Sequence, residues 1–158
     1  MSIIEQSILT SPSQERIKQF QTFHRIELPE CFVHLMQRSN GAILQDEFIK
    51  CEEQDRVVER LLCILDCSSS NSETDQYEIS VVIAQIEDRL TDDEDQLGTV
   101  IIPFAVLFGG DFICLDYRNN NKSPSIVLWD HEESEEFDPV TYHVMDSMEE
   151  LLKHNFLD

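Results

Sequence analysis

The sequence predicts an α+β fold: one domain with a central, mostly antiparallel sheet flanked by N-terminal, middle and C-terminal helices. Helix signals dominate the N-terminal part and the end of the chain, whereas β-branched and apolar runs separated by short turns fill residues 99–129. Short loops between strands indicate hairpins and antiparallel pairing. Helices followed by a meander and a closing helix are typical of the α+β class.

The chain has 158 residues, which is the length of one domain, and we treat residues 1–158 as that domain. Hydrophobic residues make up 41%, close to the globular average, so a core can form without disulfides or metals. The serine-rich stretch 68–72 is interpreted as a local loop within the domain and not as a linker.

Two helices are expected first. Ser11 suits the N-cap of the first helix and Pro12 its first position, and apolar residues follow at helical spacing from Ile17. The second helix begins at Leu28-Pro29-Glu30. It ends at Asn40-Gly41, because these residues tolerate the left-handed conformation found at helix C-termini.

The middle of the chain gives weaker signals. Residues 57–66 suit either a helix or a strand, and we favour a strand because a serine loop follows. Residues 77–90 are expected to form a helix, since their apolar members share one stripe. The run Asp92-Asp93-Glu94-Asp95 then interrupts the pattern with a loop of like charges.

Strands are expected at residues 99–102, 112–117 and 125–129, and Ser147 is expected to cap a closing helix. Between the first two strands, Gly109-Gly110-Asp111 is interpreted as a tight turn. A phosphate cradle is the alternative, but the sequence lacks the Gly-Lys-Ser/Thr that follows such glycines, and Asp111 would repel phosphate.

The charge balance is strongly acidic. Lys and Arg total 11 against 32 Asp and Glu, a formal net charge of −21. Such a chain repels phosphate, which argues against direct binding of nucleic acid and against binding to an anionic membrane. A basic protein partner, by contrast, would be attracted and steered toward it.

The chain is expected to be cytoplasmic. Residues 1–6 carry no basic segment of the kind that opens a signal peptide, and no apolar run approaches the roughly 20 residues of a membrane helix. An odd number of cysteines without an export signal indicates free thiols in a reducing compartment. The five cysteines are Cys31, Cys51, Cys63, Cys67 and Cys114.

Several short motifs follow one another over residues 28–152. They are Leu28-Pro29-Glu30-x-Phe32-x-x-Leu35 with Asn40-Gly41; Pro103-Phe104-Ala105 with Gly109-Gly110-Asp111 and Cys114-Leu115-Asp116-Tyr117-Arg118; Trp129-Asp130-His131-Glu132; and Ser147-Met148-x-Glu150-Leu151-Leu152. In order and approximate spacing they resemble the signatures of the SUKH superfamily. That superfamily includes the yeast cell-wall-assembly regulator and many bacterial toxin-immunity proteins.

The resemblance implies an α+β domain without enzymatic activity that binds other proteins. Many bacterial members neutralise a toxin, often a nuclease, and fungal members act as interaction scaffolds. It also implies structural roles for the motif residues Leu28, Pro29, Phe32, Asn40, Gly41, Pro103, Gly109, Gly110, Asp111, Leu115, Asp116, Arg118, Trp129, Asp130, His131 and Glu132. The sequence departs from the family pattern at Ala42, Tyr117 and Val106-Leu107-Phe108, and residues 44–96 carry no family motif.

A metal-dependent hydrolase is a further interpretation. It would use Asp111, Asp116, Asp130, His131 and Glu132 as ligands or as acid and base groups. We favour architectural roles for these residues, because the sequence contains no second histidine motif such as His-Glu-x-x-His. The expectation is therefore a chain with no catalytic residue, no metal and no cofactor.

Three acidic clusters are candidates for partner binding: residues 52–55, 92–95 and 132–138. A solvated surface is the plain interpretation of each, but a basic toxin cleft would attract them. The residues expected to bind the partner are Glu132, Glu133, Glu135, Glu136, Asp138, Asp92, Asp93, Glu94 and Asp95. Within the third cluster, Phe137 is either an apolar anchor or a core residue of the strand that follows.

Overall fold

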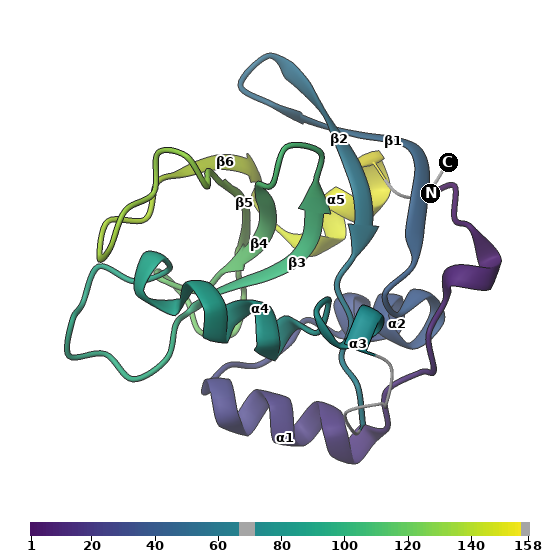
Figure 1. The fold of residues 1–158 in the computed structure, drawn as a ribbon, viewed down its shortest axis with the longest axis horizontal. Helices are drawn as coiled ribbons and strands as arrows, with labels where there is room; N and C mark the ends of the chain where they lie inside the picture. Colours follow the sequence, from purple (N-terminus) through teal and green to yellow (C-terminus); the bar gives the residue numbers. More distant parts are fainter. Residues whose placement is uncertain (67–71, 156–158) are drawn as a thin grey trace.

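Six strands form one antiparallel sheet in the computed structural model, which describes residues 1–66 and 72–155. Each strand is hydrogen-bonded to the next one along the chain, so the sheet is a meander (Figure 1). The strands are β1 (Ile43–Cys51), β2 (Gln54–Leu61), β3 (Ile101–Leu107), β4 (Phe112–Asp116), β5 (Ser125–Trp129) and β6 (Thr141–Met145). The predicted α+β class and antiparallel pairing are confirmed.

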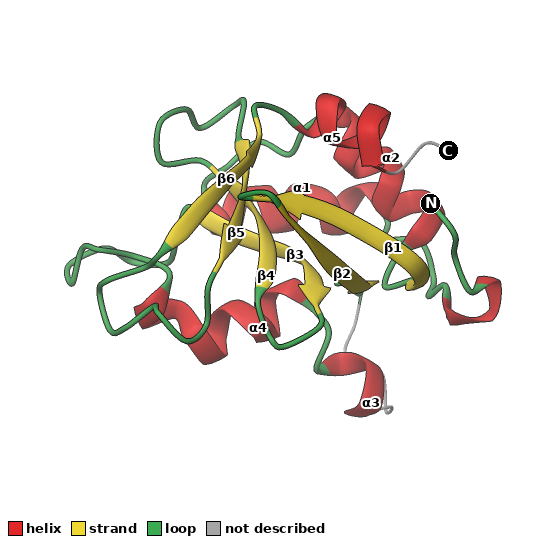
Figure 2. Cartoon of the chain, turned by 90° about the horizontal axis from the view of Figure 1, so that it is seen from above, coloured by secondary structure: helices red, strands yellow, loops and turns green. Residues whose placement is uncertain are grey.

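Helices cover both faces of this sheet, but not all of it. They are α1 (Gln14–His24), α2 (Glu30–Ser39), α3 (Ser72–Asp75), α4 (Ile79–Ile86) and α5 (Met148–Asn155), with short 3-10 turns η1 (Glu5–Ser7) and η2 (Glu87–Arg89). Figure 2 shows α2 and α5 on one side of the sheet and α3 and α4 on the other. The predicted serine loop falls on residues 68–72, of which only Ser72, the first residue of α3, lies within the described part of the chain.

The first helix begins two residues later than the sequence predicts. Ser13, and not Ser11, is the N-cap, and its Oγ accepts a hydrogen bond from the Arg16 N–H at 3.1 Å. The Ser13 N–H donates to Asp66 Oδ1 at 2.9 Å, which helps to hold Ser13 in the extended conformation of a cap. This contact crosses from a distant segment, so local sequence signals cannot reveal it.

Asn40 and Gly41 end α2 in different ways. Asn40 is fully buried, and its side chain donates to the carbonyls of Thr10 and Ile64 and accepts from the Ile64 N–H. Only Gly41 is left-handed, with φ of +69°, whereas Asn40 has φ of −52°. A Cβ on Gly41 would lie 2.8 Å from the end of the Leu9 side chain, so a larger residue would displace Leu9 in addition to straining the backbone.

Tertiary pairing changes the bounds of several predicted elements. The strand predicted at residues 57–66 is confirmed as far as Leu61, but it starts at Gln54 because β2 forms a long hairpin with β1. The helix predicted over residues 77–90 is shorter, with α4 followed by the 3-10 turn η2. The strand predicted from Thr99 begins at Ile101, where pairing with β4 begins.

The core lies between the sheet and its helices. Phe32 of α2 and Phe104 of β3 are fully buried, and their rings meet edge to face at 5.5 Å. Trp129, at the end of β5, is 1% exposed, and its indole N–H donates to the Arg89 carbonyl at 2.9 Å. These aromatic residues come from different family motifs, so the motifs build the core. Over the described residues, no helix is long and apolar enough to cross a membrane.

Candidate functional site

The turn between β3 and β4 is built on two glycines. Gly109 and Gly110 both have φ of +100°, a backbone conformation that side chains with a Cβ rarely adopt. The ring of His131 covers the second of them, because a Cβ on Gly110 would lie 3.5 Å from it. The turn therefore sets Asp111 at the start of β4, beside the residues that follow β5.

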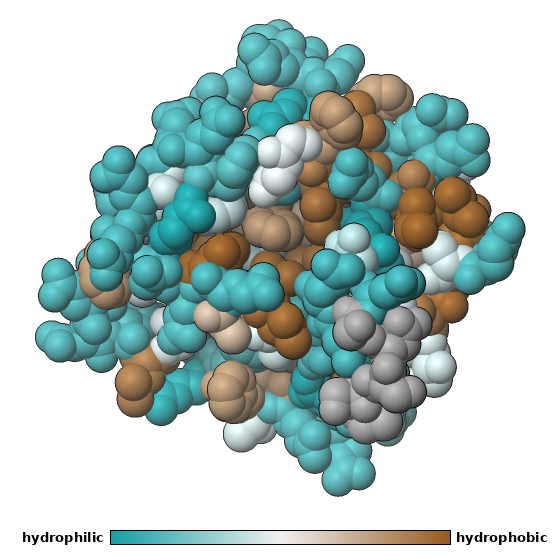
Figure 3. Space-filling view, viewed as in Figure 1, coloured by the Kyte–Doolittle hydropathy of each residue, from teal (hydrophilic) through white to brown (hydrophobic). Residues whose placement is uncertain are grey.

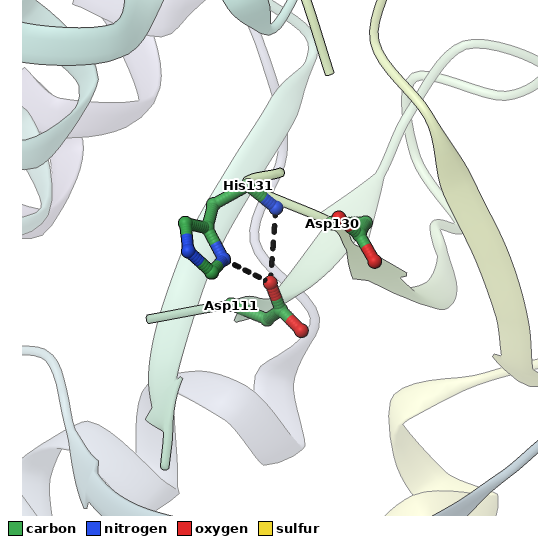
Figure 4. A group of neighbouring side chains, drawn as sticks. All are labelled: Asp111, Asp130 and His131. Atoms are coloured by element: carbon green, nitrogen blue, oxygen red, sulfur yellow. Dashed lines mark hydrogen bonds and ion pairs between the residues drawn. The ribbon is translucent and has the colours of Figure 1, made fainter. Parts of the chain in front are cut away.

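Asp111 is the centre of a hydrogen-bond network, and its side chain is almost fully buried. Its Oδ1 accepts from the His131 backbone N–H at 2.9 Å and lies 2.6 Å from His131 Nδ1 (Figure 4). Its Oδ2 pairs with the Arg56 guanidinium, which comes from β2. Burial alone would raise the pKa of Asp111, but hydrogen bonds from His131 and Arg56 outweigh it and hold this pKa below its usual value.

Asp130 caps the loop that carries the third acidic cluster. Its Oδ1 accepts from the N–H groups of Glu132 and Glu133 at 2.9 and 2.8 Å. Arg89 holds the same loop, since its guanidinium donates to the carbonyls of His131 and Ser134 and lies over the Trp129 ring. The beginning of the loop is therefore fixed, although its glutamates are exposed.

Asp111, Asp130 and His131 could alternatively form a metal site. One ligand atom each from Asp111, Asp130 and His131 lies within 4.8 Å of the others. Figure 4 joins Asp111 to His131 by two contacts and draws none to Asp130. The donors fit a cation poorly: one Asp111 oxygen accepts two hydrogen bonds, and the other faces the positive charge of Arg56.

The remaining residues of the hydrolase interpretation lie elsewhere. Asp116 is at the opposite end of β4 from Asp111, and both of its carboxylate oxygens accept hydrogen bonds from Arg118. Glu132 is exposed on the loop. The structure therefore assembles an architectural network at Asp111 and does not gather the five residues around one reaction centre.

The first and third acidic clusters meet around Tyr142 of β6. Its hydroxyl donates to Glu133 Oε1 at 2.8 Å. This bond, followed by burial and the charges of Glu133, Glu52 and Asp130, raises the pKa of Tyr142 to about 12. A pocket of about 170 Å³ lies here, lined by Cys51, Glu52, Gln54, Arg56, Leu128, Asp130, Glu133 and Tyr142. Residues far apart in the sequence thus form one acidic surface.

The second cluster adjoins the third through η2. The Phe137 N–H donates to the carbonyl of Asp88, a few residues before the cluster at 92–95. Figure 1 shows both loops at the same end of the molecule. The interpretation of Phe137 as a residue of the following strand is wrong, because β6 begins only at Thr141. Phe137 is half-buried with φ of +58°, so the alternative of an apolar anchor stays a prediction.

All nine residues expected to bind a partner are exposed on these two loops. Sequence reasoning missed Arg56, Arg89 and Tyr142. Arg89 of η2 and Tyr142 of β6 bind the loop of the third cluster, and Arg56 of β2 pairs with Asp111. The chain has 11 Lys and Arg against 32 Asp and Glu, so each arginine is a candidate partner for a carboxylate. Its partners, however, are set by the tertiary structure.

The cysteines contribute no reactive group in the described part of the chain. Cys31, Cys51, Cys63 and Cys114 are free thiols, and Cys67 lies outside the described residues. Burial, with a smaller effect of Glu78, raises the pKa of Cys63 to about 12. Burial, and then Glu149, raises the pKa of Cys31 to about 11. These thiols stay protonated at neutral pH and are poor nucleophiles.

The meander, its helices and the exposed acidic loops define a small α+β domain that presents loops from a rigid sheet. A SUKH family model, described as SMI1-KNR4 cell-wall, matches residues 14–152. The chain therefore belongs to the SUKH family, which is known in immunity proteins and cell-wall regulators and is generally non-catalytic. Membership confirms the resemblance seen in the motifs. The comparisons with curated proteins and with solved structures found no match.

Proposed function

We propose that this chain is an immunity protein, a non-enzymatic binding module that neutralises a toxin by stoichiometric occlusion. The observation that carries the proposal is the convergence of the first and third acidic clusters around Tyr142, with the second cluster adjoining through η2. Binding residues concentrate on loops held by a rigid scaffold, and these loops have that character.

The physical argument concerns charge. Repulsion among carboxylates in a chain of net charge −21 opposes compaction, and binding to a basic partner relieves it. Exposed carboxylates on a fixed loop can occupy the basic cleft of a nuclease, where the phosphates of its substrate would otherwise bind. The partner is thus a basic protein, and nucleic acid and membranes are not partners. The proposal places the protein in the cytoplasm, where its free thiols stay reduced.

The alternative is a scaffold or regulatory domain without a toxin. The description of the matching family model names the cell wall, which supports a regulatory role. Regulators and immunity proteins share this domain, so the family alone does not decide between them. The two differ in genetic context, since an immunity gene lies beside the gene of a secreted protein with a toxic C-terminal domain. A metal-dependent hydrolase is the less favoured third interpretation, because His131 and Arg56 already bind the carboxylate oxygens of Asp111.

The test is co-expression with the toxic domain encoded by the neighbouring gene. The expected result is growth rescue and a one-to-one complex in size-exclusion chromatography with light scattering. The variant Glu133→Gln, Glu135→Gln, Glu136→Gln should rescue growth less well. A matched control is Glu5→Gln, Glu15→Gln, Glu150→Gln, which removes three exposed charges elsewhere. Absence of a complex with the unmodified protein would overturn the proposal in favour of the scaffold alternative.

A further inference from the structure

Three apolar side chains form an exposed row across neighbouring strands. Phe48 of β1 and Val57 of β2 are directly paired, and the Phe108 N–H donates to the Val57 carbonyl at 2.9 Å. Their exposed fractions are 51% for Phe48, 40% for Val57 and 70% for Phe108. Directly paired residues point to the same face of a sheet. Phe48 and Val57 therefore share one face, and Phe108 adjoins them at the first residue of the β3–β4 turn.

The row continues into a larger apolar surface. Val106 of β3 pairs with Phe112 of β4, and both are half-buried. Phe112 in turn lies against Trp129, with ring centres 5.8 Å apart. Figure 3 shows apolar side chains among hydrophilic ones over the region of β2 and the β3–β4 turn. Contiguous exposed apolar surface of this kind marks interaction sites, whereas single exposed residues do not.

The row is also rigid. Phe108 begins the turn whose shape the two glycines determine, and its backbone is tied to β2. Phe48 and Val57 lie within paired strands. A side chain on a fixed backbone loses only its own rotamer freedom when it binds, which suits an interface anchor.

Exposed carboxylates flank this apolar row along β2. Asp55 and Glu59 each lie two residues from Val57 along β2, and both are exposed. The nearby Lys50 is already in an ion pair with Glu53 at 3.7 Å. On the other side, Gly110 brings the turn against His131, the first residue of the loop with the third acidic cluster. The row is thus an apolar centre with a charged and mainly acidic border, which matches the apolar core and polar rim of protein interfaces.

We propose that Phe48, Val57 and Phe108 are the apolar anchor by which this chain holds a basic protein partner. The inference rests on the proposed function and assigns it a site that the acidic loops do not include. Charge decides between occupants: a second copy would bring its own net charge of −21 against the same mainly acidic border. A cationic surface with an apolar patch at its centre complements both features.

The experiment measures binding kinetics with the toxic domain of the neighbouring gene as the probe. The variants are Phe48→Ala and Phe108→Ala, singly and together, and Val57→Thr, which keeps the shape and removes only apolar character. The matched control is Phe23→Ala, because this side chain is 79% exposed on α1, outside the acidic loops. Loss of an anchor should raise Kd about tenfold or more, mainly through faster dissociation. The control should change Kd less than about twofold.

The outcomes separate this inference from the proposed function. A complex that forms normally with all four row variants, the double variant included, overturns the anchor and leaves the immunity role standing. No binding of the unmodified protein overturns the immunity role and the anchor with it. If an alanine variant lowers the melting temperature, Val57→Thr decides, since it leaves the pairing of β1 and β2 intact. A concentration-dependent dimer of the free protein that Phe108→Ala abolishes would assign the row to self-association and overturn the proposal.

Discussion

His131 Nδ1 lies 2.6 Å from the buried carboxylate of Asp111, while the same ring covers Gly110 in the adjoining turn. This relationship joins two family motifs, one at the β3–β4 turn and one after β5. It also connects the exposed apolar row on one side of the turn with the acidic loop on the other. The stability of this corner and the binding properties of its surroundings can therefore be tested separately.

Removing the charge of Asp111 should destabilise the fold. Asp111→Asn leaves the Arg56 guanidinium without its anion, and loss of one partner from a buried pair is costly. Because Arg56 is partly exposed, we expect a loss of about 2 kcal/mol in the free energy of unfolding, measured by urea denaturation. The exposed Asp93→Asn should change it by less than about 0.5 kcal/mol. Equal stability of the two variants would show that the network is not structural.

The same carboxyl predicts acid sensitivity. The pKa of Asp111 is lower in the folded chain than in the unfolded chain, so the folded state favours the ionised form. Its contribution to stability is therefore fully present above the unfolded pKa of about 3.9 and is lost as the pH falls through the folded pKa. Urea denaturation between pH 5 and pH 3 should show a smaller decline for Asp111→Asn than for the parent. If the free energy of unfolding falls equally in both proteins, the acid sensitivity does not come from Asp111.

Trp129→Ala and Gly110→Val should damage folding and not binding alone. Truncation of a buried tryptophan typically costs about 3–5 kcal/mol. Gly110→Val is strained by the φ of +100°, because a β-branched side chain disfavours this backbone conformation even where its Cβ has room beside the His131 ring. Thermal melts followed by circular dichroism should show both losses. If both variants melt like the parent and only partner binding falls, these residues belong to an interface instead.

Partner association should depend strongly on salt. Charge steering acts mainly on the association rate and is screened over about 8 Å at physiological ionic strength. Stopped-flow measurements should show that the association rate falls as the salt concentration rises, while the dissociation rate stays nearly constant. The triple Gln variant at Glu133, Glu135 and Glu136 should flatten this dependence without lowering the melting temperature, because it relieves repulsion within the loop. An association rate that ignores salt would move the binding surface away from the acidic loops.

Metal should be absent from protein purified without added metal. The two carboxylate oxygens of Asp111 already bind His131 and Arg56, so the side chains around His131 form a poor set of metal ligands. Elemental analysis should give no stoichiometric zinc or manganese, and a metal chelator should leave the melting temperature unchanged. Stoichiometric metal that disappears in His131→Ala would contradict this prediction and revive the hydrolase interpretation.

Local patterns in the sequence were sufficient for much of the fold. The β-branched runs, the glycine turn and the cap at Ser147 predict β3 to β5 and α5, because strand alternation, tight turns and helix caps depend on neighbouring residues. The motifs also identify the family, since their order along the chain can be recognised without knowing any tertiary contact. The excess of carboxylates over basic groups likewise favours a basic partner, because net charge depends on composition and not on the fold.

Contacts between distant residues decided the rest. The cap at Ser13 and the apolar row at Val57 depend on partners many residues away, which periodicity does not encode. The hairpin of β1 and β2 is local, but its turn residues Glu52 and Glu53 have positive φ without the glycine or asparagine that signals such a turn. The meeting of Glu52 and Glu133 around Tyr142 also depends on distant partners, because the edge strands β1 and β6 contact each other and bring the loop after β1 and the loop before β6 together. The sequence alone determined the type of each charge and side chain. The tertiary structure decided which of them share a surface, because antiparallel pairing and core packing place side chains in space without regard to their separation along the chain.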